Sequence, residues 1–197
     1  MKTADRRSPS PLPFPQLETD RLLLRELRLT DAPTVQRLAG DERIARTTFV
    51  PHPYEDGLAE EWIRSQARDY RDGKLVNFGV VHLGEGGLIG SIGLVLQPRH
   101  RRAELGYWIG VPYWGRGYCT EAARAVVRWG FRELDLHRVT APHFGSNPAS
   151  GRVLEKIGMR KEGRLREHYL RDGRFEDSVV WGILRSDPEA GEGTGRA

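Results

Sequence analysis

Residues 102–144 read RAELGYWIGVPYWGRGYCTEAARAVVRWGFRELDLHRVTAPHF, and the architecture expected for the whole chain follows from them. Residues 102–110 and 137–143 are typical of β-strands. Between them, residues 117–134 predict a helix, because apolar side chains recur at helical spacing at Ala122, Ala125, Val126 and Trp129. A strand, a helix and a second strand in this order form a crossover, which requires the two strands to run parallel.

The loop between the first strand and the helix contains Gly115, Arg116 and Gly117. At the amino end of a helix, unpaired N–H groups and the helix dipole favour a bound anion. Glycine has no Cβ to keep a phosphate away, and Arg116 adds a positive charge. The loop lacks the Gly-Lys-Ser/Thr end of a Walker loop, and Thr120 replaces the third glycine of a dinucleotide loop. On these residues alone, an anion cradle and an ordinary tight turn both remain open.

The rest of the chain supplies further elements around this crossover. The expected segments are strands at 17–27, 74–83 and 89–97, helices at 31–40, 54–71 and 147–157, and a hairpin over 159–185 that turns at 171–173. Hairpins are antiparallel, whereas the crossover strands are parallel. The predicted fold class is therefore α/β (mixed α+β): a mostly antiparallel twisted sheet with one parallel pair and helices on both faces.

Length and composition indicate one domain without membrane spans. The chain has 197 residues and a net charge of +4, and its 27 acidic residues offset scattered basic ones, so nucleic acid is not the expected partner. No apolar run approaches the roughly 20 residues that cross a membrane, and the N-terminus lacks a secretory signal. We expect a cytoplasmic protein with a flexible arm over 1–16, a domain over 17–185 and a flexible tail over 186–197.

The single cysteine, Cys119, excludes an internal disulfide and a Cys-rich zinc site. A thiol at a helix N-terminus has a lowered pKa, but no histidine is near Cys119 in sequence, so packing is a better explanation than nucleophilic catalysis. The six histidines lack metal-ligand spacing, and no metal is expected.

Four stretches, in the correct order, resemble the GNAT superfamily of N-acetyltransferases, in the branch of the ribosomal-protein enzymes RimJ and RimL. They are LETDRLLLREL (17–27), AELGYWIGVPYWGRGYCTEAARAVVRWGF (103–131), the loop WGRGYC (114–119) and the C-terminal run NPASGRVLEKIGMRKEGRLREHYLRDGRFEDSVVWGIL (147–184). The loop follows the family pattern Q/R-x-x-G-x-G/A with Gly117 at its centre. Trp114 and Cys119 depart from that pattern at the first and last positions.

The resemblance implies the GNAT fold, with the two parallel strands splayed, and acetyl-CoA as co-substrate. Pantetheine would lie between strands 102–110 and 137–143 and pair with the backbone of Ile109, Gly110 and Val111. The N–H near Ile109 or Gly110 would bind the thioester oxygen. The diphosphate would lie on the backbone of Gly115, Arg116, Gly117, Tyr118, Cys119 and Thr120.

The helix at 147–157 begins with two polar residues to which the resemblance gives roles. Asn147 would bond pantetheine, although Asn147 or Ser146 also suits a simple N-cap. Ser150 matches a serine that serves as the general acid in RimL-like enzymes, whereas the tyrosine of many GNAT enzymes is replaced here by Leu154. Glu104 and Glu167 are candidates for a general base acting through water, and each fits a structural ion pair equally well.

The resemblance implies a primary amine as acceptor, and we expect the N-terminal α-amine of a protein or peptide. A small amine such as a polyamine or an aminoglycoside is the alternative, and a non-catalytic acetyl-CoA-binding regulator is another. A homodimer is one open oligomeric state, and no membrane partner is expected. Five aromatic residues line an acceptor groove or belong to the core, and the sequence leaves both open: Tyr54, Trp62, Tyr107, Trp108 and Tyr169.

Overall fold

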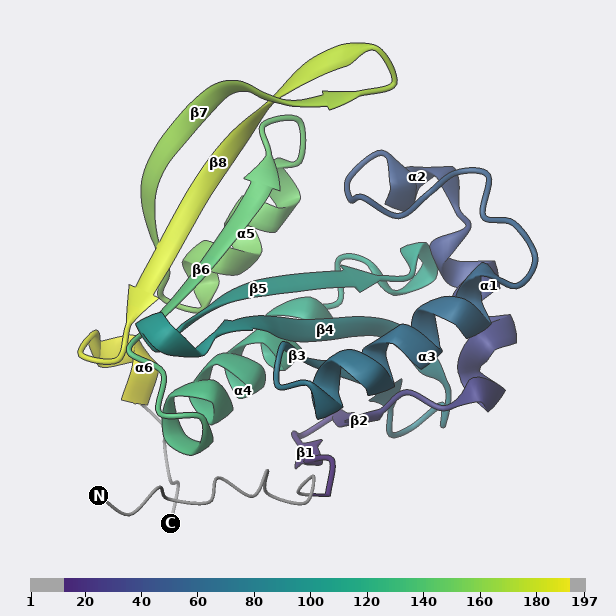
Figure 1. Cartoon of the computed structure of the whole chain (residues 1–197), viewed down its shortest axis with the longest axis horizontal. Coiled ribbons are helices and arrows are strands. Elements are labelled where there is room, and N and C mark those ends of the chain that lie inside the picture. The colour runs from purple at the N-terminus through teal and green to yellow at the C-terminus, as the bar shows by residue number, and fades with distance from the viewer. Residues whose placement is uncertain (1–12, 192–197) are drawn as a thin grey trace, which may run out of the picture.

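The computed structural model describes residues 13–191 and consists of one eight-stranded sheet in the order β1-β2-β3-β4-β5-β6-β8-β7 (Figure 1). The strands are β1 (Leu17–Glu18), β2 (Leu22–Glu26), β3 (Leu75–His82), β4 (Leu88–Gln97), β5 (Arg102–Ile109), β6 (Arg138–Phe144), β7 (Arg160–Arg171) and β8 (Arg174–Leu184). The helices are α1 (Ala32–Ala39), α2 (Glu42–Ala45), α3 (Leu58–Arg71), α4 (Tyr118–Glu133), α5 (Pro148–Lys156) and α6 (Pro188–Gly191). Most of the predicted arm and tail, residues 1–12 and 192–197, lies outside the described residues.

The predicted fold class is confirmed, because β5 and β6 pair in parallel and every other neighbouring pair is antiparallel. Two local predictions were wrong in their boundaries. The strand expected over 17–27 is interrupted and forms β1 and β2, and the helix expected from Tyr54 begins at Leu58, after Gly57 with a φ of 89°. The short helix α2 was missed. Its four residues are too few for a periodic signal, and the Asp41 side chain caps it.

Helices cover both faces of the sheet, and the sheet divides the apolar core into two clusters. On one face, α4 buries Ala122, Ala123 and Val126 against strand residues such as Phe78. On the other face, α1 and α3 bury a cluster that includes Ile63 and Trp108. Side chains alternate between the faces of a strand, so Trp108 belongs to the second cluster while its neighbours in sequence, Tyr107 and Ile109, contact the first.

The sheet opens between β5 and β6, which Figure 1 shows as two diverging arrows. The two strands pair only at Arg102 with Arg138, Ala103 with Val139 and Glu104 with Thr140. Beyond these positions β5 stays paired with β4 as far as Ile109, and β6 stays paired with β8 as far as Phe144. Each strand therefore follows the twist of its own partner, and the edges that face each other separate.

The N-terminal side of the described chain packs on this scaffold. Phe14 lies within the segment expected as a flexible arm, and its ring packs against Phe78 at 5.2 Å and Tyr70 at 4.7 Å between centroids. Of the helices described, none is long and apolar enough to cross a membrane.

Candidate active site

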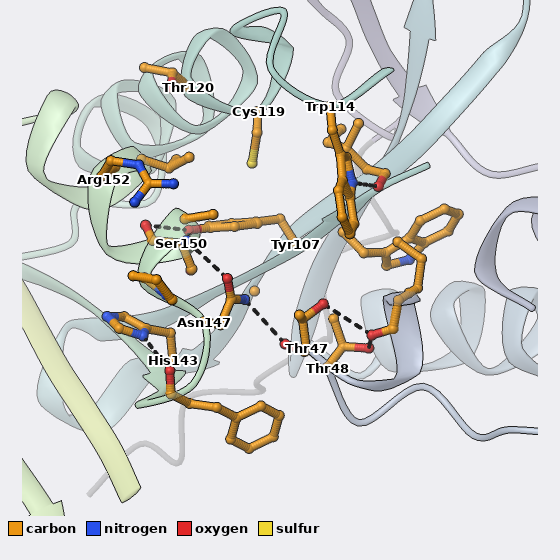
Figure 2. A pocket seen from close by; sticks show the side chains of 18 of the residues that line it. Thr47, Thr48, Tyr107, Trp114, Cys119, Thr120, His143, Asn147, Ser150 and Arg152 are labelled. Carbon is orange, nitrogen blue, oxygen red and sulfur yellow. Dashed lines mark hydrogen bonds between the residues drawn. The ribbon is translucent and has the colours of Figure 1, made fainter. Parts of the chain in front are cut away.

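A cavity of about 810 Å³ occupies the opening between β5 and β6 (Figure 2). Its walls are β5, the amino end of α4, the end of β6, α5 and residues 44–49, which we call the 44–49 segment. The 44–49 segment is held over the cavity by two contacts. The Asn147 side chain donates to the Thr47 carbonyl at 3.4 Å, and the Phe49 ring lies 5.0 Å from the rings of Phe144 and Tyr169.

The edge of β5 offers backbone groups to this cavity. The N–H of Gly110 donates to the Ile89 carbonyl at 2.8 Å, so it points toward β4. Along an antiparallel pair, successive residues direct their backbone groups alternately toward the partner strand and away from it. Tyr107 and Ile109 therefore direct their N–H groups toward the cavity. Gly110, one of the two predicted donors to the thioester, has its N–H already bonded within the sheet.

Trp114 lies along the same edge. Its indole N–H donates to the Ile109 carbonyl at 2.5 Å, and its side chain lines the cavity (Figure 2). Trp114, one of the two residues that depart from the loop pattern, thus holds the end of β5 in place while the Ile109 N–H stays directed into the opening.

The glycine loop adopts a conformation that only glycine takes readily. Gly115 has a φ of 74° and Gly117 a φ of 82°, both in the left-handed region. Gly117 is the N-cap of α4, and no side chain caps this helix end. The first N–H groups of the helix, at Tyr118, Cys119 and Thr120, therefore lack helical acceptors, and all three residues line the cavity. This end of the cavity is suited to an anion.

The cations that line the cavity differ from the one that the sequence suggested. The guanidinium of Arg116 lies 3.9 Å from the Glu85 carboxylate, and the residue does not line the cavity. Arg152 and Lys156 line it instead, one helical turn apart on α5. In the sequence, only their i, i+4 spacing indicates that the two cations share one face of α5.

Two of the residues predicted to pair with pantetheine, Gly110 and Val111, do not line the cavity.

Ser150 and Tyr107 meet across the cavity. The two hydroxyl oxygens share a hydrogen bond of 2.7 Å (Figure 2). Ser150 is held from the other side because its backbone N–H donates to the Asn147 side-chain oxygen at 3.2 Å, which makes Asn147 the N-cap of α5. Burial raises the pKa of Tyr107 well above its usual value, so the phenol keeps its proton. From the sequence, Tyr107 was only one of five aromatic residues expected in an acceptor groove or in the core.

The two candidate bases lie in different places. Glu104 lines the cavity where β5 leaves β6, and desolvation raises the pKa of its carboxyl against the opposing effect of Arg102. Glu167 is exposed on β7, has a φ of 51°, and its N–H donates to the Asp177 carboxylate at 2.7 Å. Glu167 does not line the cavity.

Cys119 is partly buried and lines the cavity, and desolvation raises the pKa of its thiol to about 12. A thiol with that pKa is protonated near neutral pH and is a poor nucleophile, which agrees with a packing role.

His143 also lines the cavity, and the sequence did not suggest it as a site residue. Its Nδ1 donates to the Phe144 carbonyl at 2.8 Å, and Nε2 is buried without a partner. Among the described residues, no group of three or more histidine, cysteine or acidic side chains is placed to hold a metal ion.

The chain is similar to known proteins in sequence and in fold. Residues 21–160 match the family model of the acetyltransferase (GNAT) domain. The Bacillus subtilis uncharacterized N-acetyltransferase YoaA is 35% identical over 173 residues, covering 87% of this chain and 98% of that protein. The Escherichia coli [ribosomal protein uS5]-alanine N-acetyltransferase is 29% identical over 191 residues, covering 90% and 95%. The structure of Vibrio cholerae spermidine N-acetyltransferase with CoA and spermine superimposes with a TM-score of 0.75 at 25% identity, covering 86% and 98%.

Proposed function

The chain belongs to the GNAT acetyltransferase family and is an acetyl-CoA-dependent N-acetyltransferase, and we propose that its acceptor is the N-terminal α-amine of a protein or peptide. The observation that carries this proposal is the charge of the cavity between β5 and β6. Among the described residues that line it, Glu104 is the only acid, against the two cations Arg152 and Lys156. Such a cavity suits one amine and the phosphates of a coenzyme.

The lining residues fit acetyl-CoA at both ends of the cavity. The N–H groups of Tyr118, Cys119 and Thr120 would bind the diphosphate, because Gly115 and Gly117 have no Cβ atoms to keep it away. Arg152 and Lys156 would neutralise phosphate charge from the side of α5. The coenzyme supplies an activated thioester.

Backbone N–H groups of β5 would hold the thioester end. Tyr107 and Ile109 direct their N–H groups into the opening, and Ser150 lies at the hydroxyl end of the Tyr107 side chain. We therefore assign stabilisation of the developing negative charge on the thioester oxygen to these two N–H groups. This replaces the expected use of Gly110, whose N–H is taken by Ile89.

The hydroxyl pair would assist the leaving sulfur. When the Tyr107 hydroxyl donates to Ser150 Oγ, the proton of Ser150 is free to point at sulfur. The raised pKa of Tyr107 opposes loss of its own proton. Tyr107 thus acts as a positioning residue, and Ser150 makes the contact with the reacting atoms.

Glu104 would accept the proton of the amine through water. Along β5, Glu104, Gly106 and Trp108 share one face of the strand. A Cβ added to Gly106 would meet no atom within 4 Å, so the space above this glycine is open. An amine bound there has Glu104 on one side. The pKa of an α-amine, near 8, is about two units below that of lysine, so a weak carboxylate base suffices.

A small polyamine is the alternative acceptor, which the similarity to the spermidine enzyme favours. A polyamine carries several positive charges and requires several carboxylates. The single acid among the described lining residues argues for the α-amine instead.

Release of the CoA thiol from acetyl-CoA tests the proposal with N-terminal peptides, spermidine and an aminoglycoside in parallel. Turnover of peptides and not of their N-terminally blocked forms is the expected result. Faster turnover of spermidine than of every peptide would exclude the proposed acceptor. Tight CoA binding with no release from any amine would indicate the non-catalytic regulator.

A further inference from the structure

A second cavity of about 570 Å³ adjoins the first on the α1 and α3 face of the sheet. Phe49 and Trp108 line both cavities, so the two spaces meet at these side chains. None of the roles assigned above uses this second cavity.

The walls of the second cavity are mainly apolar. They comprise residues of α1, α3 and the loop between them: Val35, Ala39, Val50, Pro51, Tyr54, Leu58 and Trp62. On α3, Leu58, Trp62 and Ser65 recur at helical spacing and turn one face of the helix toward the space. Aromatic walls of this kind bury a large apolar side chain favourably.

The charge of this cavity does not favour a polycation as its occupant. Among the described lining residues, one carboxylate, Glu61, is balanced by one guanidinium, Arg68. The lining thus carries no net negative charge to attract further ammonium groups, and an uncharged side chain requires no carboxylate.

The path from the reacting amine leads into this cavity. Glu104, Gly106 and Trp108 follow one another on one face of β5, at about 6.8 Å for each step of two residues. An amine above Gly106 stands between the base and Trp108. A substituent on its α-carbon then passes Trp108 and enters the second cavity.

We propose that the second cavity binds the side chain of the acceptor's first residue, and that this residue is large and apolar, such as leucine or phenylalanine. The inference rests on the proposed function, because it requires an α-amine as the acceptor group. Phe49 and Trp108 lie between the two cavities, and the α3 residues line only the second one. Substitutions on α3 should therefore alter the second cavity and leave the first unchanged.

Peptides that differ only in the first residue test the inference, with kcat/KM measured by thiol release. Leucine and phenylalanine peptides are expected to exceed the serine and lysine peptides by about tenfold or more, given the apolar area that they bury. Equal rates for all first residues would overturn the inference and leave the proposed function standing. No release with any peptide would overturn both, and so would faster turnover of free phenethylamine than of the phenylalanine peptide.

Filling the cavity gives a second test. Leu58→Trp should lower kcat/KM for the leucine peptide about tenfold and leave that of an alanine peptide within twofold. Ser65→Leu, on the same face of α3, should act in the same direction. Arg64→Trp is the matched control, because Arg64 is exposed on the same helix and does not line the cavity. A Leu58→Trp variant that slows both peptides equally, with CoA binding retained, would contradict the inference.

Discussion

The hydroxyl oxygen of Tyr107 on β5 lies 2.7 Å from Oγ of Ser150 on α5, across the cavity where β5 and β6 separate. One residue comes from the strand that carries the proposed thioester site, and the other from the helix after β6. The pair therefore forms only when the crossover is folded, and it holds Ser150 Oγ in place beside Tyr107.

Replacing Tyr107 by phenylalanine should lower kcat about tenfold, because the Ser150 proton is no longer directed by a neighbouring donor. KM for acetyl-CoA should stay within about twofold. The measurement is a double-mutant cycle with Ser150→Ala, in which the double variant should be no slower than Ser150→Ala alone. Two losses that multiply would show that the residues act separately.

Gly115→Ala should weaken CoA binding about tenfold, because an L-residue at a φ of 74° forces the diphosphate loop to rearrange. Gly86→Ala is the matched control. Gly86 lies in the turn between β3 and β4 with a φ of 70°, and neither glycine has an atom within 4 Å of an added Cβ. Both variants should lose about 1 kcal/mol of stability, and only the first should bind CoA more weakly in calorimetry. Equal affinities would place the diphosphate elsewhere.

Arg152→Gln should weaken CoA binding about tenfold and reduce its dependence on salt, because one cation near the coenzyme phosphates is lost. Arg116→Gln should leave the affinity within twofold, since Arg116 lies beside Glu85 and outside the cavity. Titration of CoA at two ionic strengths separates these outcomes. If Arg116→Gln weakened CoA binding more than Arg152→Gln, the phosphate contact would belong to Arg116 instead.

The proposed role of Glu104 as general base makes kcat depend on pH. A general base works when deprotonated, and desolvation raises the pKa of Glu104, so kcat should fall as the pH drops through a value above the usual 4.5 for this group. Measured at saturating acceptor, Glu104→Gln should lower kcat about 100-fold and remove this fall of kcat at low pH. Glu167→Gln should leave both kcat and its pH dependence unchanged, because Glu167 lies outside the cavity. If Glu104→Gln kept the same fall of kcat at low pH, Glu104 would not be the base.

The sequence predicted the scaffold well because the scaffold depends on local patterns. The apolar spacing of Ala122 and Val126 predicted α4, and the order of strand, helix and strand predicted the parallel pair. Gly117 was correctly placed at the entrance of the helix, since a left-handed φ there favours glycine.

The destinations of long side chains could not be predicted in the same way. Arg116 is adjacent to Gly117 in sequence, yet its guanidinium lies near Glu85, which belongs to the turn between β3 and β4. Arg152 reaches the cavity because α5 packs beside α4, and the pairing of Tyr107 with Ser150 joins residues 43 positions apart. These contacts depend on tertiary packing, for which a single sequence carries no periodic signal.

A crystal structure of the protein with bound CoA would test the proposed coenzyme site. We expect the diphosphate on the N–H groups of Tyr118, Cys119 and Thr120, and the sulfur between β5 and β6 beside Ser150. Coenzyme bound outside the opening between these strands, or an opening closed by side chains with CoA absent at saturating concentration, would contradict it.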